Sequence, residues 1–495
     1  MPIPDMTQRQ MSQILPVVHI LSKVLMLFAF AFLLPLGVSL ALDDGAQLAY
    51  DEAFLATFLC GALLWLLSRR GKRELQTRDG FLLVVLIWTV LPVFSAIPLL
   101  VHLPEMSFTD AYYEAVSGLT ATGSTVLSGL DSLPPSINIW RAQMHWIGGM
   151  GVIVLVVAVL PMLGVGGRQM FKAETPTPMK DSKLTPRMAE TAKGLWQVYA
   201  LFTIACMAAL WAGGMSGIDA VVHGFSVMGL GGMSSHDASM AYFDSVLLEV
   251  IVMTFALIAA VNFSTHFMAF RTRSLLTYRH DAEIRWTFGV LGASIAVLTA
   301  YLLYKGFYLD FPEALRHVAF NTVALATTLG YSTTDYNVWP YFAPLWMLFL
   351  SSFVSSSGST GGGIKMLRAV LLYKQLYREL IKLIHPSAEI HTKVGHQAVP
   401  NKIIYAVLAF LFVYVASVVI LSFILSASGL DVFTAFTAVV AMVNNTGPGL
   451  GQVGPASNYG VLNDFQTWVC SFAMLLGRLE FFTLLVVLTP VFWRK

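Results

Sequence analysis

Four short polar turns, each centred on a glycine, are the part of this sequence best suited to chemistry. They read ATGST around Gly123, GGMSS around Gly232, LGYST around Gly330 and TGPGL around Gly447. Glycine lacks a Cβ atom, so such a turn can take a positive φ and approach another backbone closely. Main-chain carbonyl oxygens from several turns of this kind can replace the water around a cation. The chemistry that we expect is therefore cation coordination by the backbone.

Each turn follows a short apolar stretch with helical character and precedes a long apolar segment. The short stretches cover residues 107–119, 219–228, 311–327 and 431–443, which are too short to cross a bilayer. The pattern recurs at intervals of about 100 residues, as internal repeats do. Any one turn could be an ordinary link between two spans, because glycine is common in turns. Four turns in register instead favour a shared aqueous axis, since bare backbone at membrane depth must line water or protein.

The elements that carry these turns are long apolar segments. Of the 495 residues, 56% are hydrophobic and 12% are charged, whereas soluble domains carry about 25% charged residues. Segments of about 20 apolar residues can span a bilayer as helices. Ten such segments lie at residues 17–42, 52–68, 80–102, 143–165, 194–215, 242–270, 286–308, 343–372, 402–427 and 465–492. The sequence therefore predicts an all-α polytopic membrane protein without a separate soluble domain.

We expect the chain to divide into a two-helix N-terminal extension, residues 1–78, and four pore repeats. The repeats cover residues 79–192, 193–283, 284–400 and 401–495. Each would consist of a helix, a short pore helix, a filter turn and a second helix, in the same orientation around a pseudo-fourfold axis along the membrane normal. The pore helices would aim their partly negative C-terminal ends at this axis, which favours cations.

The positions of the basic residues predict the orientation in the membrane. Lysine and arginine gather after the second, fourth, sixth and eighth spans, whereas the opposite loops are mostly acidic. By the positive-inside rule, both termini are cytoplasmic. The net charge of +2 is too small to indicate binding to nucleic acid.

Two features inside the apolar segments are unusual. Residues 355–363 read SSSGSTGGG, and small polar residues of this kind interrupt the eighth span. Arg478 and Glu480 lie in the last span, where an unpaired charge is costly, so both are functional candidates. Glu249 and Glu114 are weaker cases of the same kind. A packing kink in the eighth span, and simple pairing of Glu480 with a cation, are the alternatives.

The turns ATGST, LATTLGYSTTD and NNTGPGLG, with HWIGGMG opening the fourth span and GRLE near the end, resemble the Trk/Ktr/HKT superfamily of cation transporters. The likeness is greatest to its TrkH-type members, which are bacterial potassium-uptake proteins, and it covers nearly the whole chain. The second turn, LGGMSSHD, departs from the family's usual TGGFSTHD at Leu230, Met233 and Ser235. We expect this departure to alter the packing of the loop while leaving Gly232 intact.

The resemblance implies roles for particular residues. The family's potassium-coordinating carbonyl groups correspond to those of Thr122, Gly123, Gly231, Gly232, Leu329, Gly330, Thr446 and Gly447. Gly123 favours potassium, because related plant transporters that prefer sodium tend to have serine at this position. The family's gate loop, and the arginine below its filter, correspond to Gly361, Gly362, Gly363, Lys365 and Arg478.

The resemblance also implies an assembly and a mode of transport. It predicts a homodimer in the bacterial inner membrane, regulated by a cytosolic TrkA-like ring protein that binds nucleotide. The filter turns favour passive, gated potassium conduction driven by the membrane potential. An ion-coupled potassium symporter, using protons or sodium, and a less selective transporter of potassium and sodium remain alternatives. Coupling would need a second site, for which Glu249 and Glu480 are the visible candidates.

Other motifs do not indicate catalysis. Residues 358–363 have the glycine spacing of a phosphate loop but lack its lysine, and the glycines between residues 449 and 454 follow no strand. Three histidines between residues 385 and 396 fit no common zinc spacing. The three cysteines lie in apolar runs without metal-ligand spacing. We predict no enzyme activity and no cofactor beyond the permeating potassium ion.

Overall fold

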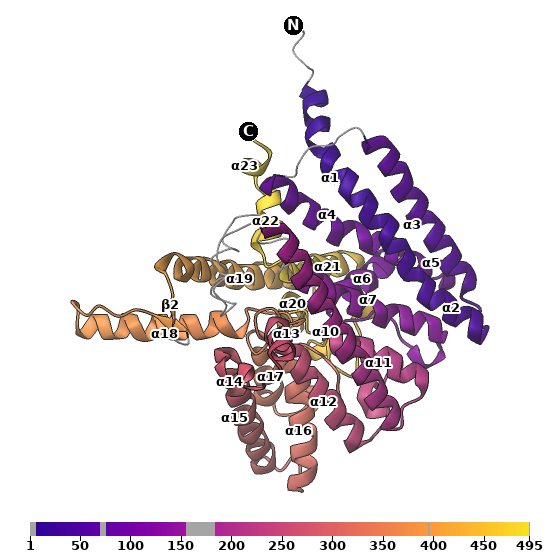
Figure 1. Cartoon of the computed structure of the whole chain (residues 1–495). Helices are drawn as coiled ribbons and strands as arrows, with labels where there is room; N and C mark the ends of the chain where they lie inside the picture. Colours follow the sequence, from indigo (N-terminus) through magenta and orange to yellow (C-terminus); the bar gives the residue numbers. More distant parts are fainter. Residues whose placement is uncertain (1–5, 70–75, 155–183, 395–396, 495) are drawn as a thin grey trace.

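The computed structural model describes residues 6–69, 76–154, 184–394 and 397–494. Helices make up most of this described chain, and one small hairpin pairs β1 (Lys393–Val394) with β2 (Gln397–Ala398). The predicted helical class is confirmed. Helix α1 (Met6–Ala29) begins, and helix α23 (Pro490–Trp493) ends, at the same end of the molecule, at the top of Figure 1.

The N-terminal helices form one side of the molecule, at the upper right of Figure 1. After α1 they are η1 (Phe30–Phe32), α2 (Leu33–Leu42), α3 (Gln47–Ser68), α4 (Thr77–Ser95) and α5 (Ile97–His102). Helix α1 packs along α3 and also against α4. The loop after α2 is fixed by Asp44, whose carboxylate accepts hydrogen bonds from Ser39 Oγ at 2.5 Å and from the Ser136 N–H at 3.0 Å.

Four groups of helices follow, and each contains one short helix that ends at a glycine turn. The first group holds α6 (Phe108–Leu119), η2 (Leu130–Ser132) and α7 (Pro135–Val154). The second holds α10 (Leu184–Ala212), α11 (Gly217–Gly229), η4 (Ser239–Tyr242), α12 (Val246–Ala260), α13 (Phe263–Thr272) and α14 (Leu276–His280). The third holds α15 (Ala282–Tyr304), α16 (Phe311–Ala326), η5 (Tyr336–Val338), α17 (Phe342–Ser351) and α18 (Met366–Ile384). The fourth holds α19 (Asn401–Ala427), α20 (Val432–Val443), η6 (Gly451–Val453), η7 (Tyr459–Val461), α21 (Asp464–Arg478), α22 (Phe482–Leu488) and α23.

The four predicted short helices are present as α6, α11, α16 and α20, with bounds within two residues of those expected. Local capping explains where three of them begin. The side chains of Ser107, Ser216 and Asp431 each accept a hydrogen bond from the N–H three residues further on. Such caps satisfy backbone donors that the first turn of a helix leaves unpaired.

The structure has fewer straight spans than the ten predicted. Six stretches of the described chain are long and apolar enough to cross a membrane: Ile14–Leu42, Gln47–Ser68, Arg78–His102, Ala192–Ala212, Ala282–Tyr304 and Asn401–Ala427. Two bent helix pairs raise the number to eight. The predicted eighth span is cut short, because α17 ends at Ser351. The predicted fourth span corresponds to α7 as far as Val154, and its remainder lies outside the described residues.

The sixth and tenth spans were wrongly predicted as continuous helices. Helices α12 and α13 meet at 92°, and α21 and α22 meet at 116°. At the first bend, the side chain of Asn262 accepts a hydrogen bond from the Ser264 N–H at 2.8 Å and so caps a new helix. At the second, Glu480 and Phe481 have positive φ angles of 53° and 57°. Two successive left-handed residues cannot continue a right-handed helix, so the chain turns.

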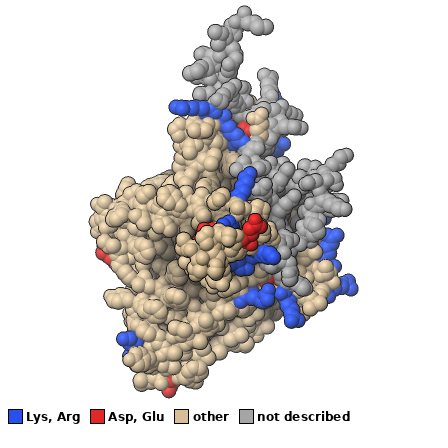
Figure 2. Space-filling model, turned by 90° about the vertical axis from the view of Figure 1, so that its left-hand side faces the viewer, with Lys and Arg blue, Asp and Glu red and all other residues tan. Residues whose placement is uncertain are grey.

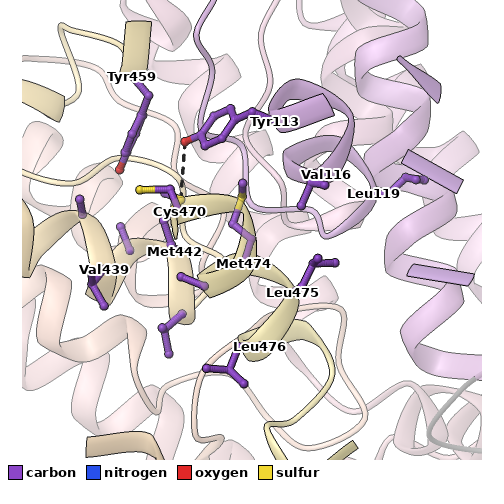
Figure 3. Packing of buried hydrophobic residues seen from close by; sticks show 14 of the residues in the cluster. Tyr113, Val116, Leu119, Val439, Met442, Tyr459, Cys470, Met474, Leu475 and Leu476 are labelled. Carbon is purple, nitrogen blue, oxygen red and sulfur yellow. Dashed lines mark hydrogen bonds between the residues drawn. The ribbon is translucent and has the colours of Figure 1, made fainter. Parts of the chain in front are cut away.

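A buried apolar cluster holds the first and fourth groups together. In Figure 3, Tyr113 and Val116 of α6 lie near Met442 of α20 and Met474 of α21. The Tyr113 hydroxyl donates a hydrogen bond to Met442 Sδ at 3.6 Å. This packing fixes the end of α6 against α20, and thereby brings the first and last glycine turns close together.

Charged side chains are unevenly distributed over the face shown in Figure 2. Lysine and arginine gather around the end of α18, which points towards the viewer, and above it. Much of the remaining surface in this view is uncharged. A largely uncharged face with basic residues gathered in one region is consistent with a multi-pass membrane protein.

Candidate functional site

The four glycine turns have the same backbone conformation. In each, the residue two places before the glycine is left-handed, with φ of 51° at Ala121, 52° at Leu230, 66° at Thr328 and 53° at Asn445. The central glycines have φ of 81° at Gly123, 76° at Gly232, 80° at Gly330 and 91° at Gly447. In each turn, the N–H directly before the glycine donates to a carbonyl oxygen five residues back, at 2.8–2.9 Å. The turns are therefore four copies of one structural unit.

These turns meet in a closed ring. A Cβ atom added to any of the four glycines would lie closer than 3.0 Å to a carbonyl oxygen of the next turn. There are four such pairs, each written as the glycine followed by the residue whose carbonyl oxygen it faces: Gly123 and Gly231, Gly232 and Leu329, Gly330 and Thr446, and Gly447 and Thr122. The order runs from the first turn to the fourth and back to the first. The eight residues named from the family resemblance are thus brought together, and only glycine fits at the four central positions.

One face of the ring opens into a cavity of about 90 Å³ that all four glycines line. This is larger than the ~10–15 Å³ that one ordered water requires. About half of the wall is polar, and its polar side chains include Ser124, Thr125, Ser234, His236, Asp237 and Ser332. The cavity can therefore hold a hydrated cation directly above the ring.

An ion pair buried behind the first turn connects that turn to the second. The Glu114 carboxylate pairs with Arg141 at 2.8 Å, and both side chains are almost fully buried. The same carboxylate accepts hydrogen bonds from Thr125 Oγ1 at 2.9 Å and from the Val126 N–H at 3.2 Å. Arg141 also donates to the carbonyl oxygen of Ser234 at 3.3 Å. One charge pair therefore holds two neighbouring turns in place.

The second and third turns are held from behind at the position equivalent to Glu114. His223 hydrogen-bonds Ser234 Oγ at 3.0 Å. Asn321 accepts from the Thr333 N–H at 3.2 Å. At the fourth turn the neighbouring residue takes this role, because Thr437 Oγ1 accepts from the Leu450 N–H at 3.1 Å. Side chains of the short helices thus fix the backbone of every turn.

The second turn, whose sequence departs from the family pattern, is held by the third. The carbonyl oxygen of Met233 accepts hydrogen bonds from Ser226 Oγ at 2.7 Å and from the Tyr331 hydroxyl at 2.8 Å. Ser235 Oγ donates to Asp219 at 2.7 Å. Leu230 is fully buried. The substituted residues are therefore packed into the fold, and Gly232 keeps the φ of the other central glycines.

The interruption predicted at residues 355–363 is confirmed, because α17 ends at Ser351 and α18 begins at Met366, and the segment lies against the ends of the short helices. Ser355 Oγ donates to the Thr327 carbonyl oxygen at 3.1 Å. Thr360 Oγ1 donates to the Met228 carbonyl oxygen at 3.1 Å. A Cβ atom on Gly362 would collide with the carbonyl oxygen of Asn444. The segment thus contacts the second, third and fourth short helices.

Two buried basic side chains, Arg478 and Lys365, hold this segment in place. Arg478 donates to the carbonyl oxygens of Thr360 at 2.9 Å and Gly148 at 3.0 Å, and so connects the segment to α7. Lys365 Nζ donates to the carbonyl oxygen of Gly361. Both side chains are buried. The structure therefore brings together the predicted gate residues Gly361, Gly362, Gly363, Lys365 and Arg478.

Two of the acidic candidates, Glu480 at the bend after α21 and Glu249 in α12, are paired with arginines. Glu480 pairs with Arg368 at 2.6 Å, which matches the alternative that it simply has a cationic partner. Glu249 pairs with Arg316 at 2.7 Å. Within the described parts of the chain, no group of three or more His, Cys, Asp or Glu side chains is arranged to hold a metal ion.

Three residues that matter to this geometry were not predicted from sequence. Arg141 was not recognised as the partner of Glu114, although a single acidic residue in an apolar helix is usually paired with a buried basic side chain. Thr328 accepts a hydrogen bond from the Gly362 N–H at 3.0 Å. Asn445 donates to Thr122 Oγ1 at 2.9 Å, across the join between the fourth and first turns. These last two contacts connect distant parts of the chain, and no local pattern marks them.

Comparisons with known proteins indicate one family. A sequence model of the TrkH cation transport proteins matches residues 49–494. The Trk system potassium uptake protein TrkH of Salmonella typhimurium is 44% identical, over 97% of this chain and 99% of its own. TrkG of Escherichia coli is 36% identical over 98% and 99%. The crystal structure of the potassium transporter TrkH from Vibrio parahaemolyticus is 43% identical and matches 97% of this chain and 100% of its own, with a TM-score of 0.90.

Proposed function

This chain belongs to the TrkH family of cation transport proteins, and from this membership we propose that it takes up potassium across a bacterial inner membrane through a gated pore. The relatives compared above are potassium uptake proteins of Trk systems. For this chain, the observation that carries the proposal is the closed ring of glycine turns. The ring is the narrow part of the pore, where carbonyl oxygens replace the water around the ion.

The ion ligands are the carbonyl oxygens of eight residues. Four belong to the residues before the central glycines, Thr122, Gly231, Leu329 and Thr446, and four to Gly123, Gly232, Gly330 and Gly447. The ends of α6, α11, α16 and α20 contribute partial negative charge of about half a unit each. Glycine rather than serine at position 123 supports a preference for potassium over sodium.

The gate is the segment with Gly361, Gly362, Gly363 and Lys365, together with Arg478. Its place beneath the ring supports this role, because an ion that leaves the ring on that side meets the segment. The guanidinium group of Arg478 adds a positive charge where a cation must pass, and this raises the barrier while the segment stays closed.

Passive conduction is favoured over coupled symport. A coupled proton or sodium ion needs a free site within the membrane, and Glu249 and Glu480 were the candidates. Each is bound by an arginine at 2.6–2.7 Å, which supports a structural role for both. We therefore propose that the membrane potential drives potassium through the pore without a second ion.

The proposal includes an arrangement in the membrane. The N-terminal extension covers residues 1–78, and the four pore repeats end at residues 192, 283, 400 and 495. Both termini are cytoplasmic. This is supported by the positions of the start of α1 and the end of α23, which lie at the same end of the molecule.

We further propose a homodimer regulated by a cytosolic TrkA-like ring that binds nucleotide. Large apolar side chains exposed along α18, among them Leu376, Leu380 and Leu383, support contact with a second copy.

Flux measurements in proteoliposomes test this proposal. We expect rubidium or potassium to enter under an imposed voltage, and this influx to be independent of pH and sodium gradients that are varied separately. Protein-free vesicles are the control. Influx that requires a proton or sodium gradient would favour symport. An absence of influx, even with the cytosolic regulator added, would contradict the pore itself.

A further inference from the structure

We propose that Thr328 couples the gate segment to the third filter turn, so that movement of the segment changes ion selectivity as well as flux. This inference rests on the proposed function and adds a positioning residue to it. The direct observation is the hydrogen bond from the Gly362 N–H to Thr328 Oγ1, at 3.0 Å. Thr328 lies two residues before Gly330, and its side chain is completely buried.

Among the described residues, the third turn is the only one of the four whose left-handed residue forms a side-chain hydrogen bond with the gate segment. The equivalent left-handed residues are Ala121 and Leu230, whose side chains have no polar atoms, and Asn445. Asn445 donates to Thr122 Oγ1 and to the Met474 carbonyl oxygen, and not to the gate segment. The hydroxyl of Thr328 therefore makes a contact that the repeat pattern does not require.

The backbone of Thr328 explains how this contact can act on the filter. Its φ of 66° is uncommon for a β-branched residue, and such a conformation persists only when its surroundings hold it. The hydrogen bond to Gly362 is one of the contacts that hold it. If the segment moves away, Thr328 can relax, and this rotates the peptide that joins it to Leu329, the residue whose carbonyl group belongs to the ring. That oxygen lies against Gly232 in the ring.

A second contact strengthens the connection at the same place. Ser355 Oγ donates to the carbonyl oxygen of Thr327, the residue before Thr328. Two successive residues at the end of α16 are thus bound to the two ends of the gate segment. A displacement of the segment therefore pulls on the third turn from both sides.

The test compares Thr328→Val with Thr322→Val in proteoliposomes without the regulator. Valine preserves the branched shape and removes the hydroxyl acceptor. Thr322 is the matched control, because it is buried in α16, which leads into the third turn, and its Oγ1 atom has no hydrogen-bond partner among the described residues. Thr328→Ser, which keeps a hydroxyl, is the conservative variant. Both potassium flux and the potassium-to-sodium permeability ratio are measured.

We expect Thr328→Val to raise potassium flux and to lower the permeability ratio, each by about fivefold, which corresponds to the loss of one hydrogen bond. Thr322→Val and Thr328→Ser keep the wild-type ratio. A Thr328→Val protein with higher flux and an unchanged ratio would overturn the coupling. So would a variant in which neither quantity changes.

A second pair of variants decides the question if Thr328→Val does not fold. Ser355→Ala removes the other contact, and Ser422→Ala in α19, away from the gate segment, is its control, because Ser422 Oγ has no hydrogen-bond partner among the described residues. We expect only Ser355→Ala to lower the ratio; equal ratios in the two variants would overturn the inference. Wild-type protein that carries no potassium would instead defeat the proposed function itself, so the two failures are distinguishable.

Discussion

The guanidinium group of Arg141 and the carboxylate of Glu114 form an ion pair of 2.8 Å that is almost completely shielded from solvent. Glu114 comes from the short helix before the first turn, and Arg141 from the helix after it. Through this pair the Thr125 hydroxyl and the Ser234 carbonyl group, which belong to different turns, are held by one charge network. The spacing of the first two turns therefore depends on a buried electrostatic contact.

Removal of one partner of this pair should destabilise the protein. Glu114→Ala leaves Arg141 as a buried charge without its carboxylate, and losses of this kind cost about 3–5 kcal/mol. Thermal unfolding of the purified protein in detergent measures the effect. Lys305→Met, at an exposed position, is the control and should unfold at the wild-type temperature. Equal unfolding temperatures for the two variants would show that the pair contributes little.

Gly123→Ser should raise sodium permeation relative to potassium. The added side chain collides with the carbonyl oxygen of Gly231 and must widen or distort the ring. Gly45→Ser separates this collision from simple backbone strain, because Gly45 has φ of 78° but open space around it. Permeability ratios from proteoliposome flux decide the matter. A wild-type ratio in Gly123→Ser would mean that the first turn does not form the filter.

Arg478→Met should raise potassium flux when the regulator is absent. The substitution removes the hydrogen bonds to Thr360 and Gly148, and it also removes the positive charge beneath the ring. We expect an increase of at least severalfold, since hydrogen bonds to charged groups contribute about 1.5–3 kcal/mol each. Arg494→Met, at an exposed position, serves as the control. Flux equal to that of the control would exclude Arg478 as part of the gate.

Asp131 should make stability depend on pH in the acid range. Burial raises the pKa of its carboxyl group, but hydrogen bonds from His236 at 2.5 Å and from the Asp237 N–H at 3.1 Å outweigh burial and lower the pKa below the usual 3.8. The stabilisation is therefore fully present above pH 3.8 and is lost as the pH falls through the lowered pKa.

Thermal unfolding of Asp131→Asn across pH checks this expectation. The variant should unfold at a lower temperature than wild type at neutral pH, and the difference should shrink below pH 3.8. Glu105→Gln, at an exposed position, should match wild type throughout. A difference between Asp131→Asn and wild type that stays constant down to the lowest pH would contradict the assignment.

Much of the helical architecture could be predicted because its signals are local. The four short helices before the turns were located within two residues, since capping residues and apolar length fix them. The bends at Asn262 and after Arg478 were not predicted, because the apolar pattern continues through both. Hydropathy does not register a single capping side chain or two left-handed residues, so these spans were read as straight.

The sequence by itself determined that this is a multi-pass membrane protein with four glycine turns, because apolar length and the need for a positive φ are properties of short segments. Only the tertiary structure decided that Gly447 closes the ring against Thr122, that Arg141 is the partner of Glu114, and that Thr328 binds Gly362. The first contact joins the first and fourth turns, the second joins helices α6 and α7, and the third joins a turn to a later loop. Each depends on how the helices pack, and no local pattern of residues specifies such packing.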